Sequence, residues 1–135
     1  LVRYDGAGFL DDAYDSWKAN PKSLVVAMAG SHRAGLLQLD PRRGQEAHEA
    51  YISFLYLAPE QRNNGVGIQL IGKAVSLSRP LDCDKLGLVC SEQNAHALAF
   101  YQKYGFHTIG TEAGAYGTLY RMQKDIGYTV REDLM

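Results

Sequence analysis

The spacing of apolar and polar residues changes several times along this chain, and each change predicts a new element. Short apolar runs at residues 23–30 and 34–40 predict a β-hairpin that turns near Gly30. Residues 50–58 are rich in aromatic and aliphatic side chains, which favours a buried strand. Pro59 ends this strand, because proline cannot donate to a sheet ladder. The pattern therefore predicts three consecutive strands.

A helical period appears at three places. Apolar residues at four-residue steps predict a short amphipathic helix within residues 8–21. The same spacing from Val66 to Leu77 predicts a second helix, which Arg79-Pro80 ends because proline restricts the residue before it. Residues 94–105 predict a third helix, with Gly105 as its C-terminal cap.

Three further apolar segments, at residues 85–91, 106–111 and 117–126, predict the remaining strands. Residues 41–49 are polar and predict a loop. The resulting order is helix, three strands, helix, strand, helix and two strands. This order indicates an α/β or α+β fold in which helices flank a mixed central sheet. The strand–helix–strand unit within residues 50–91 should be parallel, and 135 residues suit one domain.

Composition narrows the function classes. The chain is 46% hydrophobic and 21% charged, with a formal net charge of −1. This balance favours neither nucleic acid nor a membrane surface as the partner of the whole protein. Cys83 and Cys90 have the spacing of neither a redox pair nor a zinc site. Since no apolar run is long enough for a bilayer and no signal peptide is visible, we expect a cytoplasmic protein. The chain begins with Leu1, so we expect a processed chain or part of a longer one.

The glycine-rich stretch APEQRNNGVGIQL, residues 58–70, suggests a phosphate-binding turn. Residues 67–74 nearly match a P-loop, but Ala74 replaces the hydroxyl residue that would hold magnesium. Residues 65–70 begin like a dinucleotide-binding turn, but Leu70 replaces the third small residue. Both interpretations are therefore disfavoured.

A third interpretation begins at Arg62 and spans the R-x-x-G-x-G pattern to Gly67. The turn follows a buried strand and opens a helix, so unpaired amides and the helix dipole would favour an anion. Gly65 and Gly67 lack side chains that would block a pyrophosphate, and Arg62 adds a positive charge. The alternative is an ordinary flexible turn with a surface arginine.

Three segments together resemble the GNAT superfamily, the Gcn5-related N-acetyltransferases. They are YLAPEQRNNGVGIQLI (56–71), CSEQNAHALAFYQKYGFHTIGT (90–111) and LYRMQKDI (119–126). The resemblance covers residues 23–126 and leaves residues 1–22 as a shortened front, since the family opens with a strand and two helices.

The resemblance implies an acetyl-CoA site. Pantetheine would lie along the main chain of Leu55, Tyr56 and Leu57, and an N–H near Leu57 would stabilise the tetrahedral oxyanion. Core packing is the alternative for Leu55 and Leu57. The pyrophosphate would bind the amides of Arg62, Asn63, Asn64, Gly65, Val66 and Gly67.

The second segment supplies two more candidates. Asn94 matches the asparagine that contacts pantetheine, and a helix N-cap is the alternative. Tyr101 matches the tyrosine that protonates the departing thiolate as general acid, and a core aromatic is the alternative. Some members carry a glutamate base where this chain has Tyr51. Here the base is open between Glu49, His48 and water.

The implied function is transfer of an acetyl group from acetyl-CoA to a primary amine, by direct attack in a ternary complex and without a metal. The acceptor would be a small-molecule or peptide amine. The alternative is a non-catalytic acyl-CoA-binding or regulatory module, or one domain of a larger protein. A shortened front would leave a sheet edge open, which a homodimer would cover.

Overall fold

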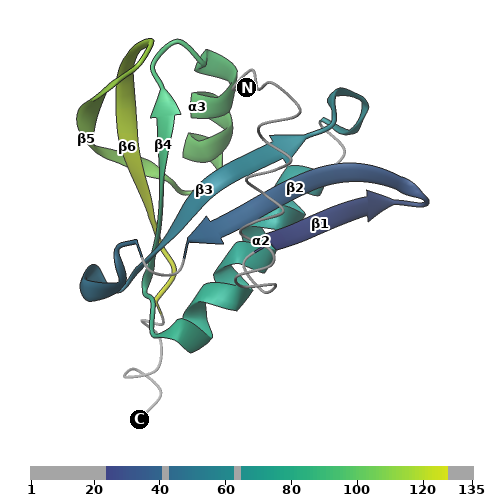
Figure 1. Ribbon diagram of the computed structural model, residues 1–135, viewed down its shortest axis with the longest axis horizontal. Helices are drawn as coiled ribbons and strands as arrows, with labels where there is room; N and C mark the ends of the chain where they lie inside the picture. Colours follow the sequence, from purple (N-terminus) through teal and green to yellow (C-terminus); the bar gives the residue numbers. More distant parts are fainter. Residues whose placement is uncertain (1–23, 41–42, 63–64, 128–135) are drawn as a thin grey trace. The chain divides into compact units, whose positions relative to one another are not determined.

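Each strand predicted between residues 23 and 126 is present in the computed structural model, which describes residues 24–40, 43–62 and 65–127 (Figure 1). The predicted front helix and the shortened front, residues 1–22, lie outside the described residues. No helix in the described part of the chain is long and apolar enough to cross a membrane.

The strands form one six-stranded mixed sheet in the order β1-β2-β3-β4-β6-β5. The strands are β1 (Leu24–Ala29), β2 (His32–Asp40), β3 (Glu49–Leu57), β4 (Lys85–Ser91), β5 (His107–Gly114) and β6 (Gly117–Asp125). The helices are α2 (Val66–Ser78) and α3 (Ala95–Lys103), with short 3-10 turns at Gln45–Ala47, Pro59–Gln61 and Arg79–Leu81. As predicted, β3 and β4 are parallel. The fold is therefore of the α+β class with a mixed sheet.

The chain divides into two compact units, and β3 and α2 each contribute to both. Unit 1 contains the residues up to Asp40 together with Ile52–Ala74, and unit 2 contains Pro41–Tyr51 together with the residues from Val75 onward. Each unit is described by itself below.

Unit 1 is built on the antiparallel β1–β2 hairpin (Figure 1). Its turn is tighter than the sequence suggested, because Gly30 has a φ of +64° and Ala29 pairs directly with His32. A positive φ costs glycine little, so a two-residue turn can form here. The apolar face of the unit is buried through Ala34, Leu37, Leu39, Leu70, Ile71 and Ala74.

Gly35 lets β2 approach its neighbours closely. A Cβ atom at this position would lie 2.9 Å from Leu70 Cδ1 of α2, 3.0 Å from the Tyr56 carbonyl oxygen and 3.2 Å from Leu57 Cδ2. One of the three obstacles is backbone, which cannot rotate away. The close packing of β2 against β3 and α2 within unit 1 therefore requires glycine.

Unit 2 contains the start of β3, then β4, β6 and β5. β3 pairs with β4 from Glu49↔Lys85 to Tyr51↔Gly87, and β4 pairs with β6 along its whole length. Helix α3 packs against β4 (Figure 1). The core residues of this unit include Leu86, Leu88, Cys90, Phe106 and Met122. Both cysteines are free and buried, as expected for small apolar residues.

Residues 43–49, the described part of the predicted polar loop, contain more regular structure than the sequence suggested. The Gly44 carbonyl oxygen accepts hydrogen bonds from the N–H groups of Ala47 and Glu49, at 2.9 and 3.0 Å. Glu49 is already the first residue of β3. Local backbone hydrogen bonds, which composition does not reveal, therefore turn the end of this segment into a 3-10 helix and a strand.

Two glycine-to-alanine substitutions should have opposite effects on stability. Gly35→Ala should lower the free energy of unfolding by about 1–3 kcal/mol because its Cβ meets packed atoms. Gly72→Ala lies on the exposed face of α2 with open space around it, so it should raise stability by about 0.5–1 kcal/mol. Urea denaturation of both variants would check this. An unchanged or raised midpoint for Gly35→Ala would contradict the packing argument.

Candidate active site

The turn after β3 holds a half-buried arginine. Pro59–Gln61 forms a 3-10 turn, and Arg62 is its extended C-cap residue. The Arg62 Nη2 atom donates to the Leu57 carbonyl oxygen at 3.4 Å. Its Nε atom is buried and has no hydrogen-bond partner in the described part of the chain. A buried, unpaired cationic donor is costly, so this guanidinium is suited to an anionic partner.

Gly65 directly precedes helix α2. Its φ of +81° lies in the left-handed region, which favours glycine, and its carbonyl oxygen accepts from Gln69 N at 3.3 Å. The N–H groups of Val66, Gly67 and Ile68 lie before Gln69 in the first turn, and groups at such positions have no carbonyl partner within the helix. Gly65 is exposed and Gly67 is buried. Asn63 and Asn64 lie outside the described residues. The arrangement is that of an anion-binding helix N-terminus beside an arginine.

The end of β3 presents a backbone donor. Ala58 N donates to the Ala34 carbonyl oxygen of β2 at 2.9 Å. Since N–H groups alternate between the two edges of a strand, the Leu57 N–H points to the edge away from β2. The side chains of Leu55, Tyr56 and Leu57 are half-buried within unit 1. The leucine side chains thus pack within the unit while the Leu57 N–H points to the other edge of the strand. Core packing and a backbone contact with a ligand are therefore compatible.

In unit 2, Asn94 is the N-cap of α3. Its Oδ1 atom accepts from Ala97 N at 3.1 Å, which is the alternative that sequence reasoning kept open. The cap uses only the carbonyl side of the amide, and the two Nδ2 hydrogens can still donate to another group. The cap therefore does not exclude contact with a ligand.

Tyr101 lies on the face of α3 that packs against β4. Its ring meets Phe106 edge-on at 5.4 Å between centroids. Burial raises the pKa of the Tyr101 hydroxyl well above its ordinary value, and the Cys90 thiol on β4 raises it further. None of the described residues forms a hydrogen bond with this hydroxyl. Tyr101 is therefore a protonated donor that is available to another group.

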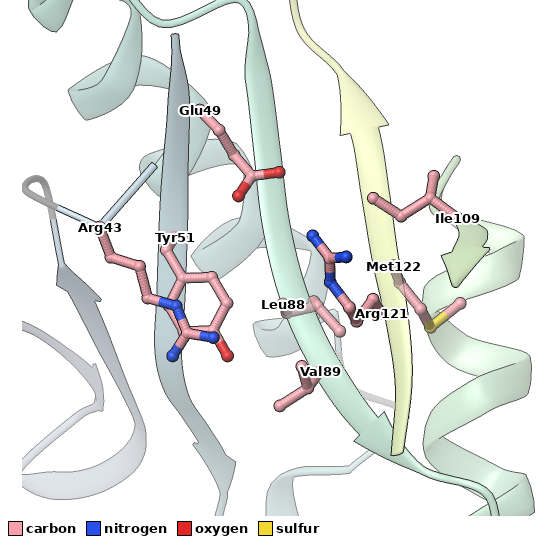
Figure 2. Close-up of a pocket in the computed structure, with 8 residues that line it drawn as sticks. All are labelled: Arg43, Glu49, Tyr51, Leu88, Val89, Ile109, Arg121 and Met122. Carbon is pink, nitrogen blue, oxygen red and sulfur yellow. The ribbon is translucent and has the colours of Figure 1, made fainter. Parts of the chain in front are cut away.

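The two candidate bases lie in different places. His48 has a φ of +57°, and its Nδ1 atom lies 3.1 Å from the Asp82 carbonyl oxygen and 3.5 Å from Asp82 Oδ2. It is exposed and belongs to the loop region. Glu49 instead lines a small pocket with Tyr51, on the same face of β3 as the sequence predicted (Figure 2).

The pocket also contains charged residues that sequence reasoning missed. Arg43 stacks over the Tyr51 ring at 3.8 Å, and Arg121 enters from β6. Burial is the main cause that raises the pKa of the Tyr51 hydroxyl. Arg43 and Arg121 oppose this rise, whereas Glu112 and Glu49 add to it. The sequence did predict that Glu49 and Tyr51 share one face of β3, because side chains two residues apart on a strand point the same way. The pairing of β6 with β4, which places Arg121 at this pocket, could not be read from the sequence.

Comparison with known proteins gives the family. Residues 3–106 match the model of the acetyltransferase (GNAT) family. GCN5-related N-acetyltransferase 4, chloroplastic, of Arabidopsis thaliana is 28% identical over 111 residues, which are 75% of this chain and 38% of that protein. N-alpha-acetyltransferase 30 of Homo sapiens is 31% identical over 88 residues, 64% of this chain and 24% of that protein. This chain thus spans well under half of these relatives.

Solved structures share the fold. Ard1 from Thermoplasma volcanium has a TM-score of 0.78 at 23% identity, over 95% of this chain and 84% of that one. A Bacillus subtilis acetyltransferase in complex with CoA has a TM-score of 0.69 at 18% identity, over 93% and 95%. Because the family model matches more than half of the sequence and the described sheet has the same fold, this chain belongs to the GNAT acetyltransferase family.

Proposed function

We propose that this protein transfers an acetyl group from acetyl-CoA to a primary amine. The observation that carries the proposal is Tyr101, a protonated hydroxyl with no hydrogen-bond partner among the described residues and a pKa raised by burial. A protein that only bound the coenzyme would not need such a donor. Membership of the family supports the acetyl transfer itself.

The turn that opens α2 would bind the coenzyme pyrophosphate. The unpaired N–H groups after Gly65 and the buried guanidinium of Arg62 offer hydrogen bonds and positive charge. The complex of the Bacillus subtilis neighbour with CoA is consistent with this use of the fold. In this proposal Asn63 and Asn64 add two further amides to the same site.

Pantetheine would use backbone groups. The ladder between β3 and β4 ends at Tyr51↔Gly87, so within the described part of unit 2 the last four residues of β4 are paired on the β6 side only. An amide-containing chain can add to such a strand edge through main-chain hydrogen bonds. In unit 1 the Leu57 N–H, which points away from β2, would stabilise the oxyanion.

The proposed acetyl transfer then needs only a proton donor for the departing sulfur and a proton acceptor for the amine. The amine nitrogen attacks the thioester carbon, and its C–N bond forms as the carbonyl electrons move to oxygen. When the tetrahedral intermediate collapses, the C–S bond breaks and Tyr101 gives its proton to the departing sulfur. The proton released by the amine passes to water, and the phenolate regains a proton from solvent. The products are the acetylated amine and free CoA.

The acceptor is an amine of a small molecule or a peptide. Proteins of this fold include one named as a nourseothricin acetyltransferase (TM-score 0.67) and Naa20 from Chaetomium thermophilum, solved with a bisubstrate analogue (TM-score 0.70). Both have 23% identity to this chain, so they support the fold and leave the acceptor open between these classes.

Replacement of Tyr101 by phenylalanine should lower amine-dependent release of free thiol from acetyl-CoA at least tenfold, because the departing sulfur loses its proton donor. A panel of small amines and peptides, followed with a thiol reagent, would measure this. Tyr104→Phe is the matched control, since Tyr104 is the C-cap residue of the same helix, three residues further on, and should tolerate the change. Coenzyme binding without turnover on any amine would favour the non-catalytic module.

Two substitutions at Asn94 separate its cap from its proposed contact with the coenzyme. Asn94→Ser keeps a capping oxygen but loses the amide, whereas Asn94→Ala loses both. We expect both variants to bind CoA several-fold more weakly, and only Asn94→Ala to lose about 1 kcal/mol of stability. Calorimetric titration and thermal unfolding would measure the two effects. Wild-type affinity in Asn94→Ser would show that the asparagine is only a cap.

A further inference from the structure

A small polar pocket lies on one face of unit 2, and all of its lining residues belong to that unit (Figure 2). Its cavity volume is about 40 Å³, which has room for a few non-hydrogen atoms, and the pocket opens to solvent. It is lined by Arg43, Glu49, Tyr51, Leu88, Val89, Ile109, Arg121 and Met122. Charged and aromatic groups therefore converge in a space that suits a few ligand atoms.

The Glu49 carboxylate is held in a defined position. Its Oε2 atom accepts from Gln123 Nε2 of β6 at 2.8 Å. A Cβ atom on Gly87 would lie 2.5 Å from the Glu49 Cδ atom, so the carboxylate fills the space that a side chain on β4 would occupy. Glycine weakens a strand interior, and here it leaves room for the carboxylate. One wall of the pocket is thus a fixed anion.

Arg121 supplies a cation from the neighbouring strand. It pairs with Val89, two residues along β4 from Gly87, and Figure 2 shows its side chain extending toward the part of β4 that Glu49 covers. Arg121 forms no ion pair within 4.0 Å with any described residue. Arg43, over the Tyr51 ring, adds a second positive charge. The pocket therefore offers separate sites for a cation and for an anion.

We propose that this pocket binds the acceptor and that the acceptor is a primary amine which also carries an anionic group a few bonds away. Glu49 binds the ammonium form of the amine, which gives one proton to water before its nitrogen attacks. Arg121 binds the carboxylate or phosphate of the same molecule. A guanidinium is suited to such oxyanions because its planar N–H groups donate to two oxygens. Arg121 is exposed, so an amine that lacks such an anionic group would leave its guanidinium to solvent. This inference rests on the proposed acetyl transfer and narrows its substrate class.

Matched pairs of amines test the inference. ω-Amino carboxylates of two to five carbons are each compared with their neutral amides, and a peptide with glutamate at its second position is compared with its glutamine counterpart. The wild-type enzyme should use the acids with at least tenfold higher kcat/KM than the amides. The two sets also distinguish a free small molecule from a peptide terminus as the source of the amine.

Three variants assign the preference to residues. Arg121→Gln should bring the acid-to-amide ratio of kcat/KM close to one, mainly through a higher KM for the acids. Glu49→Gln should weaken both members of each pair. Arg33→Gln is the control for lost charge, since Arg33 is an exposed arginine on β2 of unit 1 and should leave the ratio unchanged.

Calorimetric binding of the same amines keeps the two proposals apart. If the wild-type protein binds the acids more tightly than the amides and Arg121→Gln does not, the result supports the pocket. If none of these amines is acetylated, that separate result overturns the proposed enzyme function. Turnover of amides and acids at equal rates overturns the inference and leaves the acetyltransferase proposal intact. A preference for acids that persists in Arg121→Gln also overturns the inference.

Discussion

The short parallel ladder between β3 and β4 is the constraint on which the other features depend. Three residue pairs, from Glu49↔Lys85 to Tyr51↔Gly87, join the two strands, and the division between the compact units crosses β3 directly after them. Before this point β3 carries Glu49 and Tyr51 into the pocket of unit 2. After it, β3 leads through unit 1 to the turn at Arg62. The start of β3 thus contributes to the pocket of unit 2, and its end positions the turn at Arg62 in unit 1.

Each unit has backbone and side-chain polar groups that hydrogen bonds among the described residues leave unpaired. In unit 1 these are the N-terminal amides of α2 and the outward N–H of Leu57, beside a guanidinium whose Nε lacks a partner among the described residues. In unit 2 the edge of β4 beyond Gly87 and the Tyr101 hydroxyl are the corresponding groups. Such groups are costly in a folded protein unless a ligand completes them. A bound ligand would complete such groups in each unit.

Local signals explain why much of the fold could be predicted from sequence. Pro59 ends β3, Gly30 and Gly105 take positive φ values, and the period of apolar residues gives α2 within one or two residues of its ends. Other features depend on register between distant strands. Nothing near Gly87 in the sequence indicates that the Glu49 carboxylate lies over it, and Arg121 enters the pocket through a pairing of β6 with β4. Asn94 shows a further limit, since a cap and a ligand contact favour the same residue.

Calorimetric titration of CoA into Gly65→Glu tests the central claim most directly, namely that the α2 turn binds the coenzyme pyrophosphate. The new carboxylate would meet the phosphates, so affinity should fall at least tenfold. Gly65→Asn tolerates the φ of +81° without a charge and should bind much better, while Gly72→Glu carries the same charge further along α2 and should bind like the wild type. Wild-type affinity in a folded Gly65→Glu protein would contradict the account.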